Sequence, residues 1–301
     1  MIVRATALSL LGPYPAAQTS AAYELALVDN EALIRRTAVD HLNVPDLKRQ
    51  TALLASALYD PVTAVRTEAA RRMTEIPSPQ LDAGQQKLFQ KALDEYQQSM
   101  EYSADFAFGR YNLGNLYANL KQPEKAVANY RAAVRIDNRF YPAKVNLAML
   151  YNQMGRKDEA EILLREVVAA QSELHEVQYS LGLLLAEKKQ FEEAALYLKK
   201  AAAGLPERSR VHYNLGLLLQ HLKLDSEAEA ALLTALEMDP DNFDYLYALA
   251  DHYLKRQKFF QARRIAEQMI AKHPDKSIGF EILNFVVKHP ATKNQIGRAH
   301  V

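Results

Sequence analysis

Apolar and small residues recur every 34 residues through more than half of the chain. A leucine followed by glycine or alanine marks each repeat, at Leu113-Gly114, Leu147-Ala148, Leu181-Gly182, Leu215-Gly216 and Leu249-Ala250. A second alanine follows twelve residues after each small residue, at Ala126, Ala160, Ala194, Ala228 and Ala262. A helical pair that repeats at a fixed period of this length predicts an α-solenoid, in which each hairpin stacks on the next.

Five repeats follow one another without insertion, at residues 107–140, 141–174, 175–208, 209–242 and 243–276. Positions 4, 7, 8 and 11 of each repeat fall within a narrow arc at 100° per residue, so they predict the buried face of a first helix. The glycine or alanine at position 8 predicts a close crossing with a second helix. That second helix carries alanine at position 20 and, at position 24, Tyr130, Leu164, Leu198, Leu232 or Ala266. Prolines end three repeats at position 32 (Pro206, Pro240 and Pro274).

This pattern resembles the tetratricopeptide repeat (TPR) family, and the resemblance covers residues 107–276. The resemblance implies a scaffold for protein–protein interaction without catalytic activity. The tryptophan usual at position 4 is absent, and the five repeats instead carry Arg110, Lys144, Gln178, His212 and Leu246. Residues 81–106 are predicted to form a connecting helix from a degenerate TPR, with Ala92 and Tyr96 one period before Ala126 and Tyr130.

A shorter period of 31 residues precedes residue 80. It relates Val3-Arg4, Ile34-Arg35 and Val65-Arg66, and in step with them Ala7, Ala38 and Ala69. Asp29 and Asp60 each precede the arginine of their own repeat by six residues. Residues 1–80 therefore resemble the HEAT family, which implies an Asp–Arg ladder between neighbouring repeats. Capping is the alternative role for these carboxylates, because an acidic group at a helix start accepts free N–H groups and meets the favourable end of the helix dipole.

Both ends of the chain depart from the repeat pattern. The first 31-residue repeat begins in its second helix, so we expect residues 1–80 to be truncated at the start. Residues 277–290 are predicted to form a terminal helix, which either opens a sixth repeat or closes the array, because Asn284 stands where the other repeats have glycine or alanine. Residues 291–301 are expected to be a disordered, non-native tail.

Composition excludes several classes of function. The formal charge is +1, from 37 basic and 36 acidic residues without a basic block, so nucleic acid is not an expected partner. No apolar run is long enough to span a membrane, and the start does not resemble a secretory signal. The chain has no cysteine, which excludes disulfides, thiolate metal sites and covalently attached haem within it.

We expect no catalytic site, no metal site and no cofactor. The eight histidines show no one-turn spacing of a helix-borne zinc site. Phosphate-binding glycine loops and nucleophile elbows are absent from the sequence. Neighbouring carboxylates such as Glu192-Glu193 open second helices, where they suit the helix dipole. An enzyme is therefore the weakest of the functional hypotheses.

The predicted binding surface is the face of each first helix opposite its core. In the TPR family, positions 5, 9 and 13 line the concave groove. In this chain they are Tyr111, Asn115 and Asn119; Val145, Met149 and Gln153; Tyr179, Leu183 and Glu187; Tyr213, Leu217 and His221; and Tyr247, Asp251 and Lys255. A row of tyrosines beside Met and Leu suits an extended peptide or a partner helix. The alternative is that the tyrosines only pack against the neighbouring repeat.

A carboxylate-ended ligand is disfavoured by position 5. TPR proteins that bind chaperone tails use Lys at position 5 and Asn at position 9, and here Asn115 matches whereas position 5 is Tyr or Val throughout. The sequence thus predicts an all-α protein, a right-handed α-solenoid of HEAT-like repeats followed by TPRs, that binds a protein or peptide. An alternative comes from the sequence of residues 2–8 and from the order of HEAT-like repeats followed by TPRs. Both resemble the carboxyl-terminal region of bacterial multihaem c-type cytochromes. That resemblance implies a docking region linked to an upstream haem domain and a periplasmic location, whereas without it a cytoplasmic location is expected.

Overall fold

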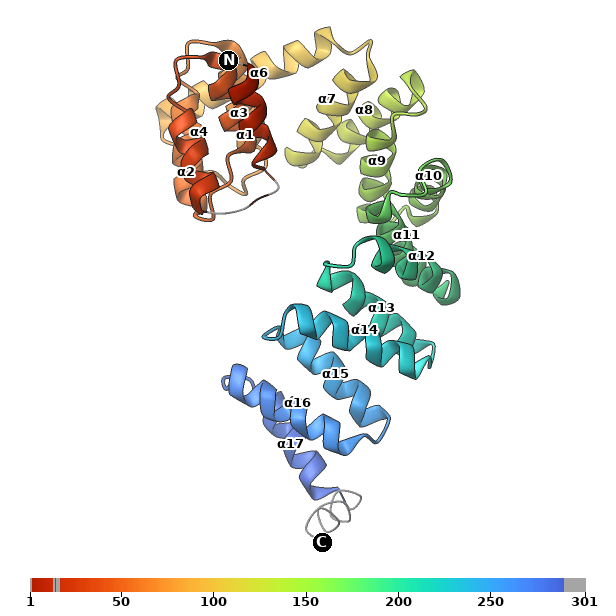
Figure 1. Ribbon diagram of the computed structural model, residues 1–301. Helices are drawn as coiled ribbons and strands as arrows, with labels where there is room; N and C mark the ends of the chain where they lie inside the picture. Colours follow the sequence, from red (N-terminus) through yellow and green to blue (C-terminus); the bar gives the residue numbers. More distant parts are fainter. Residues whose placement is uncertain (1, 13, 15–16, 290–301) are drawn as a thin grey trace. The chain divides into compact units, whose positions relative to one another are not determined.

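The computed structural model describes residues 2–12, 14 and 17–289, and within them the chain forms seventeen α-helices and no strand (Figure 1). The predicted all-α repeat fold is confirmed. The chain divides into two compact units, residues 1–150 and residues 151–301, and the division falls within one helix. The expected tail, residues 291–301, lies outside the described residues.

The first unit contains eight helices and most of a ninth. These are α1 (Ile2–Leu10), α2 (Ala17–Ala26), α3 (Ala32–His41), α4 (Leu47–Ala57), α5 (Thr63–Met73), α6 (Ala83–Tyr102), α7 (Ala107–Asn119), α8 (Pro123–Ile136) and α9 (Tyr141–Gln153). The second unit continues with α10 (Lys157–Ala170), α11 (His175–Glu187), α12 (Phe191–Gly204), α13 (Ser209–His221), α14 (Asp225–Met238), α15 (Phe243–Lys255), α16 (Phe259–Lys272) and α17 (Ile278–Lys288). Helices pack mainly against their neighbours in sequence, such as α7 on α8 and α13 on α14.

Glycine at position 8 lets the two helices of a repeat cross closely. A Cβ atom added to Gly114 would lie 2.4 Å from the ring of Tyr130. The equivalent atom on Gly216 would lie 2.7 Å from the side chain of Leu232. Such distances are shorter than van der Waals contact. The two helices can therefore cross this closely only because glycine has no side chain. In these two hairpins the small residue at position 8 therefore packs against the large residue at position 24.

Polar residues at position 4 tie three of the five repeats to the loop that precedes them. Arg110 Nε donates to the carbonyl of Ala104 at 3.1 Å, and Gln178 Nε2 donates to the carbonyl of Ser172 at 2.7 Å. His212 Nε2 lies 3.1 Å from the carbonyl of Pro206, an oxygen that can only accept. Gln178 is buried. These bonds go to carbonyls of the loops that precede the first helices, so position 4 makes a polar contact in these three repeats.

An arginine ladder links the hairpins between α1 and α6. Arg35 donates from Nε and Nη2 to the two carboxylate oxygens of Asp60, at 2.6 and 2.9 Å, and from Nη1 to the backbone carbonyl of Asp29. Arg4 pairs with Asp29 at 2.7 Å. Arg66 continues the series with Glu95 at 3.0 Å in place of an aspartate. Each arginine therefore reaches the carboxylate of the next hairpin.

The ladder carboxylates also accept the backbone amide two residues further along, but neither aspartate caps the first turn of α3 or α5. Asp29 Oδ1 accepts from the amide of Glu31, and Asp60 Oδ1 accepts from the amide of Val62, each at 2.9 Å. Burial alone would raise the pKa of Asp60, but hydrogen bonds from Arg35 and the Val62 amide lower it below its ordinary value. The charged form is thus the one that the folded chain favours.

The first 31-residue repeat differs from the other two. Ile34 and Val65 are buried as the period predicts, but Val3 is 81% exposed and Ala7 is exposed as well. The contact of α1 with α3 therefore leaves these two residues uncovered.

At the other end, α17 packs against α16 through a face that includes Gly279, Ile282 and Val286. Asn284 is exposed rather than placed at a helix crossing. Phe280 and Phe285 on the same helix are 44% and 54% exposed, so among the described residues one face of α17 is covered and these two side chains are not.

Candidate functional site

The predicted groove residues of the first unit are partly committed to packing between repeats. Tyr111 stacks edge-on against Phe140 with ring centroids 5.3 Å apart, and its hydroxyl lies 3.3 Å from Asn146 Nδ2. Val145 is half-buried, whereas Met149 is 50% exposed. Within this unit, Met149 is therefore the predicted residue that offers most apolar surface.

Asn115 is the centre of a hydrogen-bonded cluster. Its Oδ1 accepts from the Tyr130 hydroxyl at 2.8 Å and from Asn146 Nδ2 at 2.9 Å. Both lone-pair directions of Oδ1 are therefore occupied, and Asn115 Nδ2 remains free to donate. Asn119, one turn further along α7, donates from Nδ2 to Thr74 Oγ1 at 3.1 Å.

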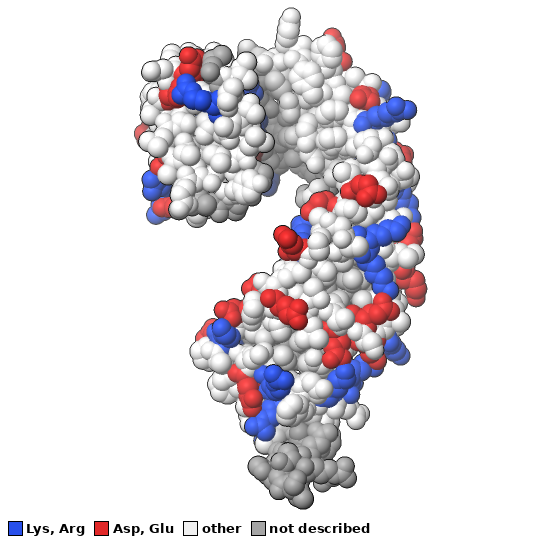
Figure 2. Space-filling model, viewed as in Figure 1, with Lys and Arg blue, Asp and Glu red and all other residues white. Residues whose placement is uncertain are grey.

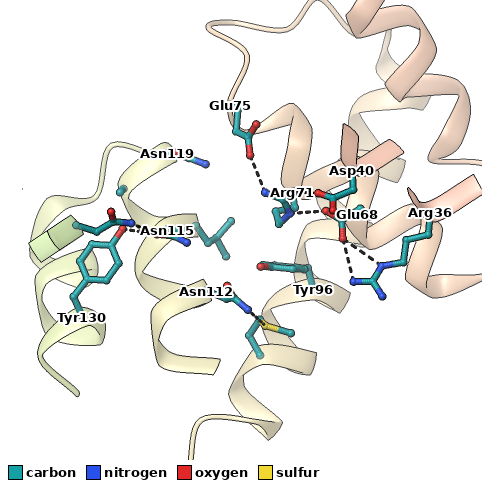
Figure 3. Close-up of a pocket in the computed structure, with 14 residues that line it drawn as sticks. Arg36, Asp40, Glu68, Arg71, Glu75, Tyr96, Asn112, Asn115, Asn119 and Tyr130 are labelled. Carbon is teal, nitrogen blue, oxygen red and sulfur yellow. Dashed lines mark hydrogen bonds and ion pairs between the residues drawn. The ribbon is translucent and has the colours of Figure 1, made fainter. Parts of the chain in front are cut away.

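These asparagines line one wall of a cavity of about 560 Å³ that lies wholly within the first unit (Figure 3). The cavity was not predicted from the sequence. Its carboxamide wall consists of Asn112, Asn115, Asn119 and Asn146, from α7 and α9. Its ionic wall consists of Arg36, Asp40, Glu68, Arg71 and Glu75, from α3 and from α5 and the turn after it. A volume of this size is typical of ligand pockets.

Arg71 organises the ionic wall. It donates from Nε to Glu68 at 2.6 Å, from Nη2 to Asp40 at 2.7 Å and from Nη1 to Glu75 at 2.8 Å. Arg36 reaches Glu68 only at 3.4 Å, and its side chain is 53% exposed. Burial lowers the pKa of Arg71, but its three carboxylates more than offset this effect and raise the value overall. Arg72 also pairs with Glu75, so three arginines and three carboxylates form a fixed ion-pair network with no net formal charge.

Tyr96 lies between the two walls, and its hydroxyl points into the cavity (Figure 3). Tyr96 is 7% exposed as a whole residue, and its hydroxyl is not among the fully buried polar atoms that lack a partner in the described residues. Burial raises its pKa to about 12, so the hydroxyl keeps its proton at physiological pH. The 34-residue period assigns Tyr96 to a degenerate TPR, and Tyr96 is indeed buried. The period gave no indication that the tyrosine hydroxyl would line a cavity.

In the second unit, the tyrosines at position 5 fall into two kinds. Tyr179 is 8% exposed, and its hydroxyl accepts from Asn214 Nδ2 at 2.6 Å. Tyr213 is half-buried, with its ring centroid 4.9 Å from that of Tyr245. Tyr247, in contrast, is 44% exposed. Packing therefore accounts for Tyr179, whereas Tyr247 presents free aromatic surface.

The other predicted residues of the second unit lie mostly at the surface. Leu217 is 38% exposed, Leu183 is half-buried, and Gln153, Glu187, His221 and Lys255 are exposed. Asp251 Oδ2 accepts from Gln220 Nε2 at 2.9 Å and pairs with Lys255 at 2.6 Å. The ring of His221 packs against Phe191, with centroids 4.2 Å apart.

Charge does not single out a further site. Figure 2 shows basic and acidic side chains interspersed on the visible face, without a large area of one sign. Across the described ranges, no group of three or more His, Cys, Asp or Glu side chains could hold a metal ion. No helix within those ranges is long and apolar enough to cross a membrane.

Comparison with known sequence families identifies the repeats. Two profiles described as tetratricopeptide repeat match this chain, one at residues 120–182 and 185–245 and the other at residues 226–277. The chain carries tetratricopeptide repeats. The match confirms the TPR prediction within these residues, whereas the HEAT-like assignment of residues 1–80 stays a prediction. No curated protein matches the sequence.

Solved TPR structures share the fold. YrrB, a TPR protein with an unusual peptide-binding site, has a TM-score of 0.55 at 22% identity, over 61% of this chain and 95% of YrrB. PilF of Pseudomonas aeruginosa has a TM-score of 0.51 at 24% identity, over 63% of this chain and 85% of its own. A tetratricopeptide repeat protein from Parabacteroides merdae has a TM-score of 0.54 at 18% identity, over 60% of this chain and 72% of its own. At these identities the likeness concerns the fold alone.

Proposed function

We propose that this chain is a non-catalytic scaffold whose TPR first helices bind a peptide or a partner helix. TPR proteins generally mediate protein–protein interactions. The observation that supports a binding face in this chain is the exposed apolar and aromatic surface at positions 5 and 9, which Tyr247 and Leu217 provide in the second unit. Met149 provides it in the first. Aromatic side chains of this kind give large contact area at low entropic cost.

The division among the tyrosines sharpens the proposal. Tyr179 is already bound to Asn214, so its ring and hydroxyl contribute to the stacking of repeats. Tyr247 has no such bond and keeps nearly half of its surface free. YrrB, which shares the fold, is described by its peptide-binding site. We therefore expect a ligand to depend on Tyr247 and Tyr213 more than on Tyr179.

The test is a peptide selection followed by titration. Peptides enriched from a random library on the full chain are labelled, and their affinity is measured by fluorescence anisotropy for Tyr247→Ala, Tyr213→Ala and the control Phe260→Ala. Phe260 is 61% exposed on the second helix α16, so its removal takes away similar aromatic surface outside the proposed face. We expect Tyr247→Ala to weaken binding about tenfold, as loss of an interface aromatic does. Equal losses in Tyr247→Ala and Phe260→Ala would contradict the proposal.

We propose that terminal carboxylates are not the main determinant of the ligand. Position 5 lacks lysine in all five repeats, and the arginines of the cavity that Asn115 lines are already paired with carboxylates. Peptides with acidic tails are therefore expected to bind no more tightly than their amidated forms. Tight, salt-sensitive binding that requires the free carboxylate would overturn this part of the proposal.

We also propose, as an alternative setting, that the chain is a docking region of a larger extracytoplasmic multihaem cytochrome. The arginine ladder between α1 and α6, followed by TPR helices, supports the order of repeats on which that resemblance rests. The chain itself has no cysteine to attach haem. The genomic sequence upstream of Met1 tests the alternative: repeated Cys-x-x-Cys-His motifs would support it, and a start codon with a ribosome site would remove it.

A further inference from the structure

The charged groups of the cavity in the first unit are paired with one another. On the ionic wall, Arg71 donates to three carboxylates at 2.6, 2.7 and 2.8 Å, and Arg36 lies 3.4 Å from one of them, Glu68. An anionic or cationic ligand would have to compete with these pairs before it gained a partner of its own. A ligand without charge can bond to the same groups while the pairs stay intact.

The ion pairs leave acceptor capacity on this wall. Asp40 accepts from Arg71 through Oδ1, whereas its Oδ2 makes no hydrogen bond in the described structure and lies 3.9 Å from His41 Nε2. The Asp40 side chain is 44% exposed, so a ligand can reach it. Each oxygen of Glu75 accepts from one arginine, and a carboxylate oxygen can accept two hydrogen bonds. The ionic wall can therefore receive several donors from a ligand.

The opposite wall adds donors as well as further acceptors. Asn112 makes one weak contact, 3.5 Å from its Nδ2 to Met100 Sδ, so both ends of its carboxamide can bond to a ligand. Asn119 uses Nδ2 toward Thr74, and its Oδ1 makes no bond among the described residues. Asn115 uses only Oδ1 within the same ranges, which leaves Nδ2 to donate.

Apolar side chains separate the two polar walls. Tyr96, Met100 and Leu116 line the cavity, from α6 and α7. Tyr96 lies between the walls with its hydroxyl pointing into the cavity (Figure 3). Its ring and the thioether of Met100 offer C–H surface beside the polar groups. The cavity thus combines apolar surface with polar groups on two opposite sides.

A neutral saccharide has the same combination of properties. Each of its hydroxyls can donate one hydrogen bond and accept two, so it can bond to carboxylates on one side and to carboxamides on the other. The faces of its rings carry C–H groups, and it has no charge to compete with the ion pairs. The cavity volume of about 560 Å³ lies within the range of roughly 300–1,000 Å³ that small-molecule sites occupy.

We propose that this cavity binds a neutral saccharide, with Asp40 as an acceptor on the ionic wall, Asn112 on the opposite wall and Tyr96 between them. Such a site recognises hydroxyl groups on two sides of a sugar ring and discriminates against added charge. This binding is a separate activity from the protein- or peptide-binding function proposed above, and neither depends on the other.

The test titrates neutral sugars into the full chain. Saturation-transfer difference NMR with millimolar maltose, cellobiose, sucrose and trehalose identifies which disaccharide binds. Isothermal titration calorimetry then measures its affinity for Asn112→Ala, Asp40→Asn and Tyr96→Phe. Asn138→Ala and Asp105→Asn are the matched controls, because both residues are exposed in loops outside the cavity. Asn112→Ala removes only a weak contact within the protein, so circular dichroism should show an unchanged unfolding midpoint.

We expect each cavity variant to weaken binding roughly three- to tenfold, the range of a single hydrogen bond, and the controls to leave the affinity unchanged. Raising the salt concentration should have little effect, because the ligand forms no ion pair. Glucosamine and glucuronate, which add a positive and a negative charge to glucose, should bind no more tightly than glucose itself.

Three results would overturn the inference. The first is no saturation transfer from any of the four disaccharides. The second is an affinity that neither Asn112→Ala nor Asp40→Asn changes. The third is glucuronate that binds more tightly than glucose and loses affinity with salt, which would assign the site to an anion held by Arg36.

Discussion

Between α1 and α6, an arginine of one hairpin reaches a carboxylate of the next, as Arg35 does with Asp60. In α7–α8 and α13–α14, a glycine of the first helix leaves room for a large side chain of the second, as Gly114 does for Tyr130. The first arrangement is directional and needs specific charged partners. The second depends on volume alone. The two regions of one helical array are thus held together by interactions that fail in different ways.

The comparison teaches where each region is sensitive. Removal of one partner of a buried ion pair leaves an uncompensated charge, whereas addition of a methyl group to a close crossing forces the helices apart. The ladder should therefore tolerate changes in size but not in charge, and the crossings should behave in the opposite way.

The largest effect is expected from Arg35→Ala. The Arg35 and Asp60 side chains are only 13% and 8% exposed, so loss of the guanidinium leaves Asp60 buried without its principal partner. We expect the free energy of unfolding to fall by about 3 kcal/mol, measured by urea denaturation. Arg4→Ala is the matched control, because Arg4 holds the same ladder position with a 59% exposed side chain and should change stability little. Equal losses in both variants would show that ladder position, and not burial, sets the effect.

Gly114→Ala should have the next largest effect, since its new Cβ atom would lie 2.4 Å from the ring of Tyr130. The hydroxyl of Tyr130 is held by Asn115, which keeps the ring from moving aside. We expect a loss of about 1–3 kcal/mol in thermal or chemical unfolding.

A second substitution tests the steric origin of that loss. Tyr130→Leu in the Gly114→Ala background gives the pair of residue types that the second repeat carries at these positions, Ala148 and Leu164. The double variant should recover part of the lost stability relative to the sum of the single changes. Strict additivity would show that the crossing is not the cause.

His252→Leu should have the smallest effect, and it should stabilise the fold. His252 is fully buried in α15, and neither ring nitrogen has a hydrogen-bond partner in the described structure. The buried polar groups of the ladder are hydrogen-bonded, whereas the His252 ring is buried without a hydrogen bond. A buried polar group without a partner lowers the free energy of unfolding by about 1 kcal/mol or more. The other four repeats place leucine at the same position, as Leu116, Leu150, Leu184 and Leu218.

The gain from His252→Leu should grow in acid. Burial lowers the pKa of His252 below its ordinary 6.5, opposed by Glu229 and Asp225 and assisted by Arg256 and Lys258. The unfolded chain therefore takes up this proton more readily, and the folded state loses stability as the pH falls below about 6.5. Unfolding midpoints of both proteins from pH 7.5 to pH 5 measure the difference. A constant difference across this range would mean that His252 does not titrate differently on folding.

Sequence period was enough to predict the helical array, because the crossings depend on residue size at fixed spacing. Leu-Gly pairs and the residues sixteen positions later, such as Gly216 and Leu232, are read directly from the chain. The ladder was predictable only as a choice between pairing and capping. Asp29 pairs with Arg4 and accepts the Glu31 amide ahead of α3, without capping the helix itself.

The cavity was beyond the sequence for a physical reason. Its walls come from two repeat types with different periods, so no single register aligns Asn112 with Arg71 or Tyr96. Tyr96 has the spacing of a core residue and is buried as such a residue would be. Its hydroxyl, however, points into the cavity (Figure 3). Similarly, position 5 contains tyrosine in four repeats, and the sequence alone does not show which of these rings is buried. That depends on contacts with the next repeat, such as the hydrogen bond from the Asn214 side chain to Tyr179.

Helices that pack mainly against their neighbours in sequence give this protein a graded resistance to opening. An internal hairpin such as α13–α14 contacts both α12 and α15, so its amide protons should exchange only when contacts on both sides are lost. Contacts close in sequence also form with little loop-closure entropy, which favours rapid folding from many starting points. A partner that bridges several hairpins would slow fraying throughout the segment it spans.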